Sequence, residues 1–156
     1  MYKDVLTTAM TTSISEVLET MFFMPVDVVS VADVASAADP QTEAYEVRLD
    51  FSGPAAGVFR LHLPVELARE VASDFLGITP AAVTAEEMQE TAKEMVNMLA
   101  GNTLSHYDSG AVFDLGVPEK VISHADEDRL RQGADSVCLD IRALSSRMVM
   151  TVLTRK

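Results

Sequence analysis

Residues 45–51 alternate between apolar and charged side chains, and this pattern constrains the fold more than any other feature of the sequence. The apolar set is Tyr45, Val47, Leu49 and Phe51, and the charged set is Glu46, Arg48 and Asp50. Because successive side chains of a β-strand point to opposite faces, the pattern predicts a half-buried strand. A turn rich in glycine and proline follows, and a second alternation then runs over residues 58–63. We therefore expect an antiparallel hairpin.

Three segments have the apolar spacing of helices. They are residues 4–22, 64–77 and 85–105. The first should end before Pro25, because the residue preceding a proline disfavours helical geometry. Pro64 suits the first position of the second helix, and Gly77 suits its C-cap. Thr84 and Glu87 have the spacing of a capping box, which predicts the start of the third helix.

Further strands are predicted from apolar, β-branched runs. These runs are residues 26–34, 136–144 and 148–153, with short candidates at 111–113 and 117–122, whereas residues 35–42 and 123–133 are typical of loops. Residues 145–147 should join the last two strands as a second hairpin. Both faces of the last strand are apolar, which indicates a central strand or one covered by another subunit. Helices that interrupt antiparallel hairpins define an α+β fold with a mostly antiparallel sheet.

Size and charge narrow the classes of function. The chain has 156 residues, and we expect residues 1–156 to form a single domain. Twenty-four acidic against twelve basic residues give a net charge of −12, which disfavours binding to nucleic acid or to an anionic membrane. No apolar run approaches the roughly 20 residues of a membrane span, and the start lacks the pattern of a secretion signal. The single cysteine, Cys138, fits a reducing compartment, so we expect a cytoplasmic protein.

The third helix carries the most informative side chains. One predicted face is apolar, and it consists of Met88, Ala92, Met95, Val96, Leu99 and Thr103. Roughly opposite lie Glu90, Glu94, Asn97 and Gly101, with Glu87 and Met98 near the edge. Glu94 and Asn97 are three residues apart, so both can contact the same ligand. Taken alone, a glutamate and an asparagine on an outward helix face are usually solvated surface.

The longer string from Glu90 to Asn102 resembles the active-site helix of the CheC, CheX and FliY phosphatase family. The family pattern is an Asp or Ser, three residues, Glu, two residues, Asn, and a later Pro. The resemblance covers nearly the whole chain, and the single Glu-x-x-Asn motif is similar to the CheX type. Two departures are present, because Glu90 stands in the place of Asp or Ser and Pro118 lies slightly closer to Asn97 than usual.

The resemblance implies hydrolysis of the aspartyl phosphate on a CheY-like response regulator. Asn97 would position the attacking water, and Glu94 would contact a lysine of the regulator. Glu90, Met98 and Gly101 would be further contacts with that partner. The regulator would supply Mg²⁺, so the chain would need no cofactor or metal of its own. The family also implies a homodimer that associates through its sheets.

Other readings remain open. The same fold could bind a response regulator or a flagellar-switch component without catalysis, or serve a structural role in a signalling assembly. His62, His106 and His124 lack the spacing of metal ligands, so we interpret them as structural or exposed. The acidic run at 126–128 lacks the oxygen pattern of a calcium loop. We interpret Cys138 as a small packing residue.

Overall fold

The sheet is the framework on which every other element packs. The structure, a computed structural model, describes residues 1–31, 43–121, 134–143 and 146–155. Within these ranges, seven strands form one sheet in the order β1-β6-β7-β3-β2-β4, and β5 pairs with β2. The strands are β1 (Asp27–Val31), β2 (Ala44–Ser52), β3 (Gly57–Pro64), β4 (Asp114–Leu115), β5 (Glu119–Lys120), β6 (Ala134–Ala143) and β7 (Ser146–Arg155). All their pairings are antiparallel.

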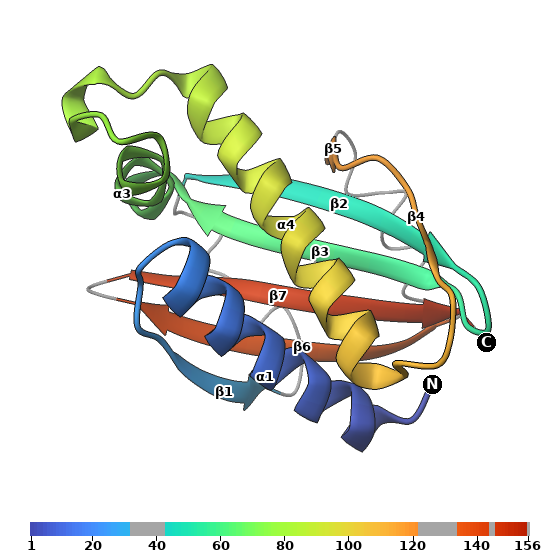
Figure 1. Ribbon diagram of the computed structural model, residues 1–156. Coiled ribbons are helices and arrows are strands. Elements are labelled where there is room, and N and C mark those ends of the chain that lie inside the picture. The colour runs from blue at the N-terminus through green and yellow to red at the C-terminus, as the bar shows by residue number, and fades with distance from the viewer. Residues whose placement is uncertain (32–42, 122–133, 144–145, 156) are drawn as a thin grey trace.

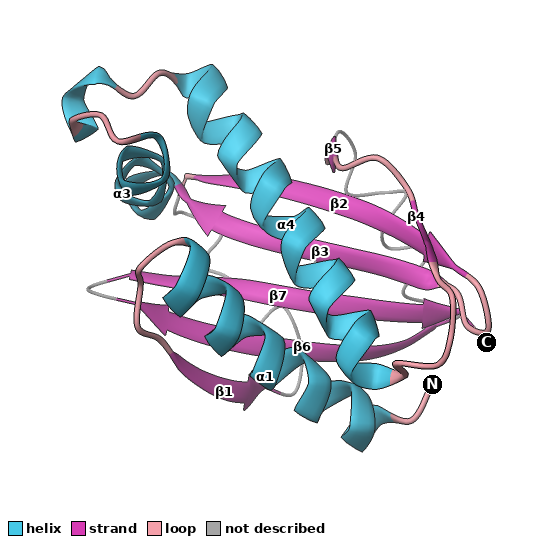
Figure 2. Cartoon of the chain, viewed as in Figure 1, coloured by secondary structure: helices cyan, strands magenta, loops and turns pink. Residues whose placement is uncertain are grey.

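The helices lie together on one face of this sheet (Figures 1 and 2). They are α1 (Lys3–Met21), α3 (Val65–Leu76) and α4 (Ala85–Tyr107), with a 3-10 turn at Pro80–Ala82. Figure 1 shows α4 crossing the sheet diagonally, with α1 beside it. The core fills the space between the helices and the facing strand residues, such as Leu49 and Phe59 below Met95 and Leu99. The predicted α+β class with an antiparallel sheet is confirmed.

The first helix matches its prediction within one residue at each end. α1 ends at Met21, and Phe22 directly after it is fully buried and packs on Phe75 of α3 with ring centroids 5.2 Å apart. The strand predicted at 26–34 is β1 as far as residue 31. Its remainder and the predicted loop at 35–42 fall in the stretch 32–42, which lies outside the described residues.

The predicted first hairpin is confirmed, with one difference in burial. In β2 the burial alternates as expected, and Leu49 pairs with Phe59 across the hairpin. In β3, Val58 and Arg60 are buried as well as their apolar neighbours. This strand lies between β2 and β7, and the side chains of both neighbours flank Val58 and Arg60 on the face away from the helices. Pro64 ends β3 and is the N-cap of α3. The helix therefore begins at Val65, one residue later than predicted.

Local capping fixes the ends of α3 and α4. Gly77 adopts a left-handed conformation with φ of 70°, and its N–H donates to the Ser73 carbonyl at 2.9 Å. The Glu87 N–H donates to Thr84 Oγ1 at 3.1 Å, while the Thr84 N–H donates to Glu87 Oε1 at 3.0 Å. The predicted C-cap and capping box are both confirmed, so the start of α4 is held by its own sequence.

The short strands after α4 differ from their prediction. Residues 111–113 are not a strand, and only residues 114–115 and 119–120 pair with β2. The apolar residues that suggested longer strands are largely solvent-exposed, since Val112 is 80% and Val117 is 78% exposed. Gly116 and Pro118 interrupt the pairing. Residues 122–133, including the predicted charged loop, lie outside the described residues.

The closing hairpin is longer than predicted. Ser146 and Arg147 were expected in the turn but already pair with Ala143 and Arg142, and residues 144–145 lie outside the described part. β7 lies between β6 and β3, so the prediction of a central strand from its two apolar faces is confirmed. None of the described helices combines the length and hydropathy that crossing a membrane requires.

Candidate functional site

The inner face of α4 is the apolar stripe predicted from the sequence. All six stripe residues are buried: Met88, Ala92, Met95, Val96, Leu99 and Thr103. α4 contacts both flanking helices and strands β2 and β3. Because this face is fixed against the sheet, residues about half a turn away are directed outward.

The outward face carries Glu94 and Asn97. Glu94 is exposed and Asn97 is half-buried. Within the described residues, neither side chain makes a hydrogen bond or an ion pair. Two unpartnered polar groups therefore lie less than one helical turn apart on a helix that is rigidly anchored. Such a pair can bind a group brought by another molecule without first breaking an internal contact.

Two other carboxylates of α4 already have partners. Glu90 is exposed and lies 3.4 Å from Lys93 Nζ, an ion pair between residues three apart. Glu87 belongs to the capping box. The two remaining predicted partner contacts differ in burial, because Met98 packs its side chain against the core and Gly101 presents only backbone. A Cβ added at Gly101 would lie 3.8 Å from Leu115 Cδ1, an ordinary contact distance.

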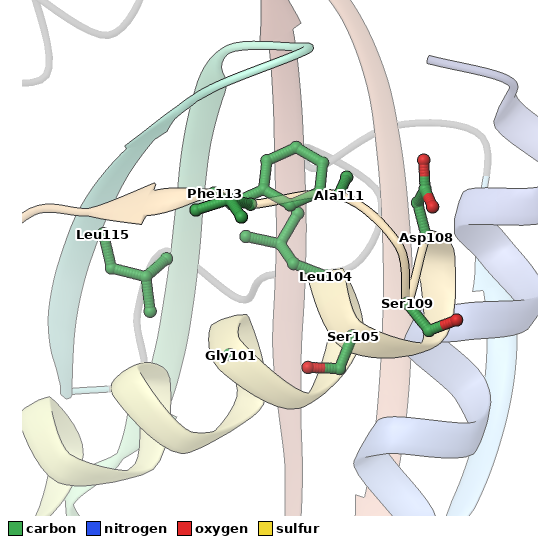
Figure 3. Close-up of a pocket in the computed structure, with 9 residues that line it drawn as sticks. Gly101, Leu104, Ser105, Asp108, Ser109, Ala111, Phe113 and Leu115 are labelled. Atoms are coloured by element: carbon green, nitrogen blue, oxygen red, sulfur yellow. The ribbon is translucent and has the colours of Figure 1, made fainter.

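An open groove borders the outward face at Gly101. It has a volume of about 530 Å³ and lies between the last turns of α4 and the segment that leads into β4 (Figure 3). Its lining is Gly101, Leu104, Ser105, Asp108, Ser109, Ala111, Val112, Phe113 and Leu115. We call it the α4–β4 groove. Sequence reasoning missed it, because residues 111–113 were interpreted as a strand; the signal that could have found it is the cluster of apolar residues beside Gly110 and Gly116.

A polar contact fixes the far end of α4 to α1. Glu16 Oε2 accepts a hydrogen bond from Asn102 Nδ2 at 3.1 Å and lies 2.8 Å from His106 Nε2. The hydrogen bond with His106, then that from Asn102, lowers the pKa of the Glu16 carboxyl. His106 and Asn102 thus have a structural role.

The other residues considered from the sequence lie away from this face. His62 Nδ1 is 3.1 Å from Glu46 Oε1 on β2. Cys138 is buried and lies 3.6 Å from the Thr151 hydroxyl, consistent with a packing role. His124 and residues 126–128 lie outside the described residues. No group of three potential metal-ligating side chains occurs in the part of the chain that the structure describes.

Comparison with known protein families gives a match to the model of chemotaxis phosphatase CheX over residues 45–142. The chain belongs to the CheX chemotaxis phosphatase family. The matched region includes the β2–β3 hairpin, α3 and all of α4, so the resemblance stated from the α4 sequence is confirmed. A search of curated proteins gave no match.

Solved structures of CheX proteins share the whole fold. Chemotaxis protein CheX from Vibrio vulnificus has a TM-score of 0.73 at 17% identity, with 96% of each chain covered. A CheX-CheY-BeF3-Mg complex from Borrelia burgdorferi matches with a TM-score of 0.69 at 16% identity, covering 100% of this chain and 99% of that one. The FliM middle domain from Vibrio alginolyticus also matches, with a TM-score of 0.64 at 6% identity and coverage of 96% and 90%. The fold is therefore shared by CheX proteins and the FliM middle domain.

Proposed function

We propose that this CheX-family chain hydrolyses the aspartyl phosphate of a CheY-like response regulator, with Asn97 positioning the water and Glu94 engaging the regulator. The observation that carries the proposal is the unpartnered Glu94 and Asn97 pair on the outward face of α4. The family match supports the phosphatase activity. The Borrelia complex, which contains CheY, BeF3 and Mg, supports the choice of partner.

The reaction is attack of water on phosphorus. A bond forms between the water oxygen and phosphorus while the bond to the aspartyl oxygen breaks, which yields orthophosphate and a free carboxylate. An amide oxygen at Asn97 would accept one hydrogen of the water and hold it in line with the breaking bond. Positioning of this kind supplies much of the catalysis in phosphoryl transfer, because little other covalent chemistry is required of the protein.

Glu94 would pair with the lysine beside the regulator's phosphorylated aspartate. A charge-assisted contact of this kind orients the two proteins and raises the rate of productive encounter more than the affinity. Glu90, Met98 and Gly101 would contact the partner around this pair. Mg²⁺ would enter with the regulator, so the chain would supply no metal ligand.

Three broader expectations belong to the same proposal. Residues 1–156 would act as a single domain in the cytoplasm, where phosphorylated response regulators occur. Two copies would associate through their sheets, as the family resemblance implies. A homodimer that pairs the sheet faces without helices would leave the helical face of each copy open, because all described helices lie on one face of the sheet (Figure 2).

A non-catalytic binding module is the second candidate. The match to the FliM middle domain favours it, because a protein of the flagellar switch has the same fold. Binding alone does not require a water-positioning amide, so Asn97 distinguishes the two functions.

The test is loss of phosphate from a purified, phosphorylated CheY-like regulator with Mg²⁺. We expect the parent chain to accelerate this loss and Asn97→Ala to reduce kcat by at least about 100-fold, the scale of lost positioning. Asn102→Ala is the matched control, because this asparagine is on the same helix but hydrogen-bonds to Glu16. Equal activity of Asn97→Ala and the parent would remove Asn97 from the mechanism, and a parent chain that binds the regulator without accelerating phosphate loss would favour the non-catalytic module.

A further inference from the structure

The α4–β4 groove has an apolar wall that faces solvent. Figure 3 shows Gly101 and Ser105 on α4 below the segment that carries Ala111, Phe113 and Leu115. Val112 in this lining is 80% exposed and Leu115 is 39% exposed. The one carboxylate of the lining, on Asp108, accepts a hydrogen bond from the Gly110 N–H at 3.1 Å. The lining is therefore mixed: an apolar wall formed by the segment that leads into β4 faces polar groups on Ser105, Asp108 and Ser109.

The wall of the groove is preformed. The Gly116 N–H donates to the Asp50 carbonyl at 2.7 Å, and Leu115 pairs with Phe51 of β2. Phe113 packs edge-on against Phe51, with ring centroids 6.2 Å apart. A wall fixed by the sheet loses little conformational entropy when a partner docks, so the apolar contacts it makes are available for affinity.

The crossing segment also approaches the hairpin turn closely. A Cβ added at Gly53 would lie 2.7 Å from the Val112 carbonyl oxygen, and Gly53 has φ of 145°. The backbone of Val112 is thus held against the turn, while its side chain faces solvent. A single exposed valine needs no explanation, but Val112 belongs to the apolar wall of a groove, and grooves with contiguous apolar surface are typical interaction sites.

The position of the groove identifies what covers it. Gly101, which lines the groove, follows Asn97 by four residues, or about 6 Å along the helix. A specific interface buries about 800 Å² on each partner, a patch roughly 30 Å across. A globular partner whose footprint is centred on Asn97 would therefore reach the Gly101 end of the α4–β4 groove.

We infer that the α4–β4 groove docks apolar side chains of the same response regulator, next to its phosphorylation site. This inference rests on the proposed function for its occupant. Two neighbouring regions would then have separate roles. The Glu94 and Asn97 pair acts on the phosphoryl group, and the groove supplies affinity for the regulator. Val112 is a specificity residue in this scheme, because it touches the partner and not the reacting atoms.

The test is Val112→Asn, which removes apolar contact without disturbing a buried side chain. We expect the KM for the phosphorylated regulator to rise about fivefold or more at unchanged kcat, the effect of losing one apolar contact with the partner. The matched control is Leu76→Asn. Leu76 is 43% exposed and ends α3, which lies at the opposite end of the helical layer from β4 and is not part of the sheet (Figure 1). Its KM should equal that of the parent.

Binding is measured in parallel by calorimetric titration with the regulator activated by beryllium fluoride and Mg²⁺. A parent chain without catalysis, but with binding that Val112→Asn weakens, would contradict the proposed function and support the groove. A KM and Kd of Val112→Asn within twofold of the parent would overturn the inference. A change in sedimentation behaviour with unchanged KM would also overturn it, because the groove would then be a contact between copies of this chain.

Discussion

His106 Nε2 lies 2.8 Å from Glu16 Oε2, and this contact joins the last turns of α4 to the middle of α1. Asn102 donates to the same oxygen at 3.1 Å. The hydrogen bond with His106 and then that from Asn102 lower the pKa of the Glu16 carboxyl below its ordinary value of 4.5. The folded protein therefore favours the ionised form of Glu16 more than the unfolded chain does.

The pH dependence of stability follows from the direction of this shift. A carboxyl whose pKa is lowered by folding stabilises the protein above its ordinary pKa, and this contribution is lost as the pH falls through the folded-state pKa. We expect Glu16→Gln to lower the free energy of unfolding slightly at neutral pH, since the contact is solvent-exposed. The difference from the parent should close below pH 4.5.

Urea unfolding at a series of pH values measures this difference. Glu19→Gln, an exposed position on the same helix, controls for the change in net charge. A gap between Glu16→Gln and the parent that stays constant from neutral to acidic pH would show that ionisation of Glu16 is not linked to folding.

The capping box gives a prediction about the start of α4. Thr84→Ala removes the acceptor for the Glu87 N–H and should lower the free energy of unfolding by about 1 kcal/mol. Thr79→Ala is the matched control, because Thr79 precedes the 3-10 turn and makes no side-chain cap. Chemical unfolding of both variants measures the effect. Equal free energies of unfolding for the two variants would mean that the capping box does not contribute to the stability of the protein.

Local signals in the sequence predicted the elements whose geometry is set by neighbouring residues. The Thr84 and Glu87 spacing and the position of Gly77 each specify a backbone conformation directly, and both were correct. The extent of burial on β3 was not predictable in this way, because Arg60 is buried by its place in the sheet order. The strand predicted around Val112 was wrong because tertiary context also decides strand formation. An apolar β-branched residue forms a strand only where a pairing partner is present.

The same distinction between local signals and tertiary contacts applies to the candidate site. Helical periodicity alone placed Glu94 and Asn97 on the face opposite Met95, and the buried stripe agrees with that geometry. The α4–β4 groove could not be found from periodicity, because it depends on contacts between α4 and a segment that pairs with β2. The roles of Glu94 and Asn97 stay predictions, since a helix face specifies position and not chemistry.

Replacement of Glu94 tests the orienting contact. Glu94→Gln keeps the size of an exposed side chain and removes its charge, so we expect the KM for phosphorylated regulator to rise several-fold, by about 1 kcal/mol of lost interaction. The rise should shrink at high ionic strength because salt screens the ion pair. Glu86→Gln removes the same charge from the first turn of α4 and should leave the KM unchanged. A KM effect that does not depend on salt would exclude an ion pair at Glu94.

Gly101 allows stability and partner binding to be separated. Gly101→Ala should raise the free energy of unfolding by about 0.5–1 kcal/mol, because glycine in a helix interior is unfavourable relative to alanine. The added Cβ would meet Leu115 Cδ1 only at 3.8 Å, so no strain offsets this gain. Gly77→Ala should have the opposite sign and cost about 1 kcal/mol, since Gly77 has φ of 70° with open space around it.

The activity of Gly101→Ala then decides why a glycine occupies this turn of α4. If the backbone at Gly101 contacts the regulator, the new methyl group separates the two surfaces and the KM rises although the fold is more stable. Thermal unfolding and steady-state dephosphorylation of one preparation measure both properties. A variant that is more stable and has the KM of the parent would exclude Gly101 from the interface. The added methyl group would then have no effect on binding, so the regulator would not contact this part of the backbone.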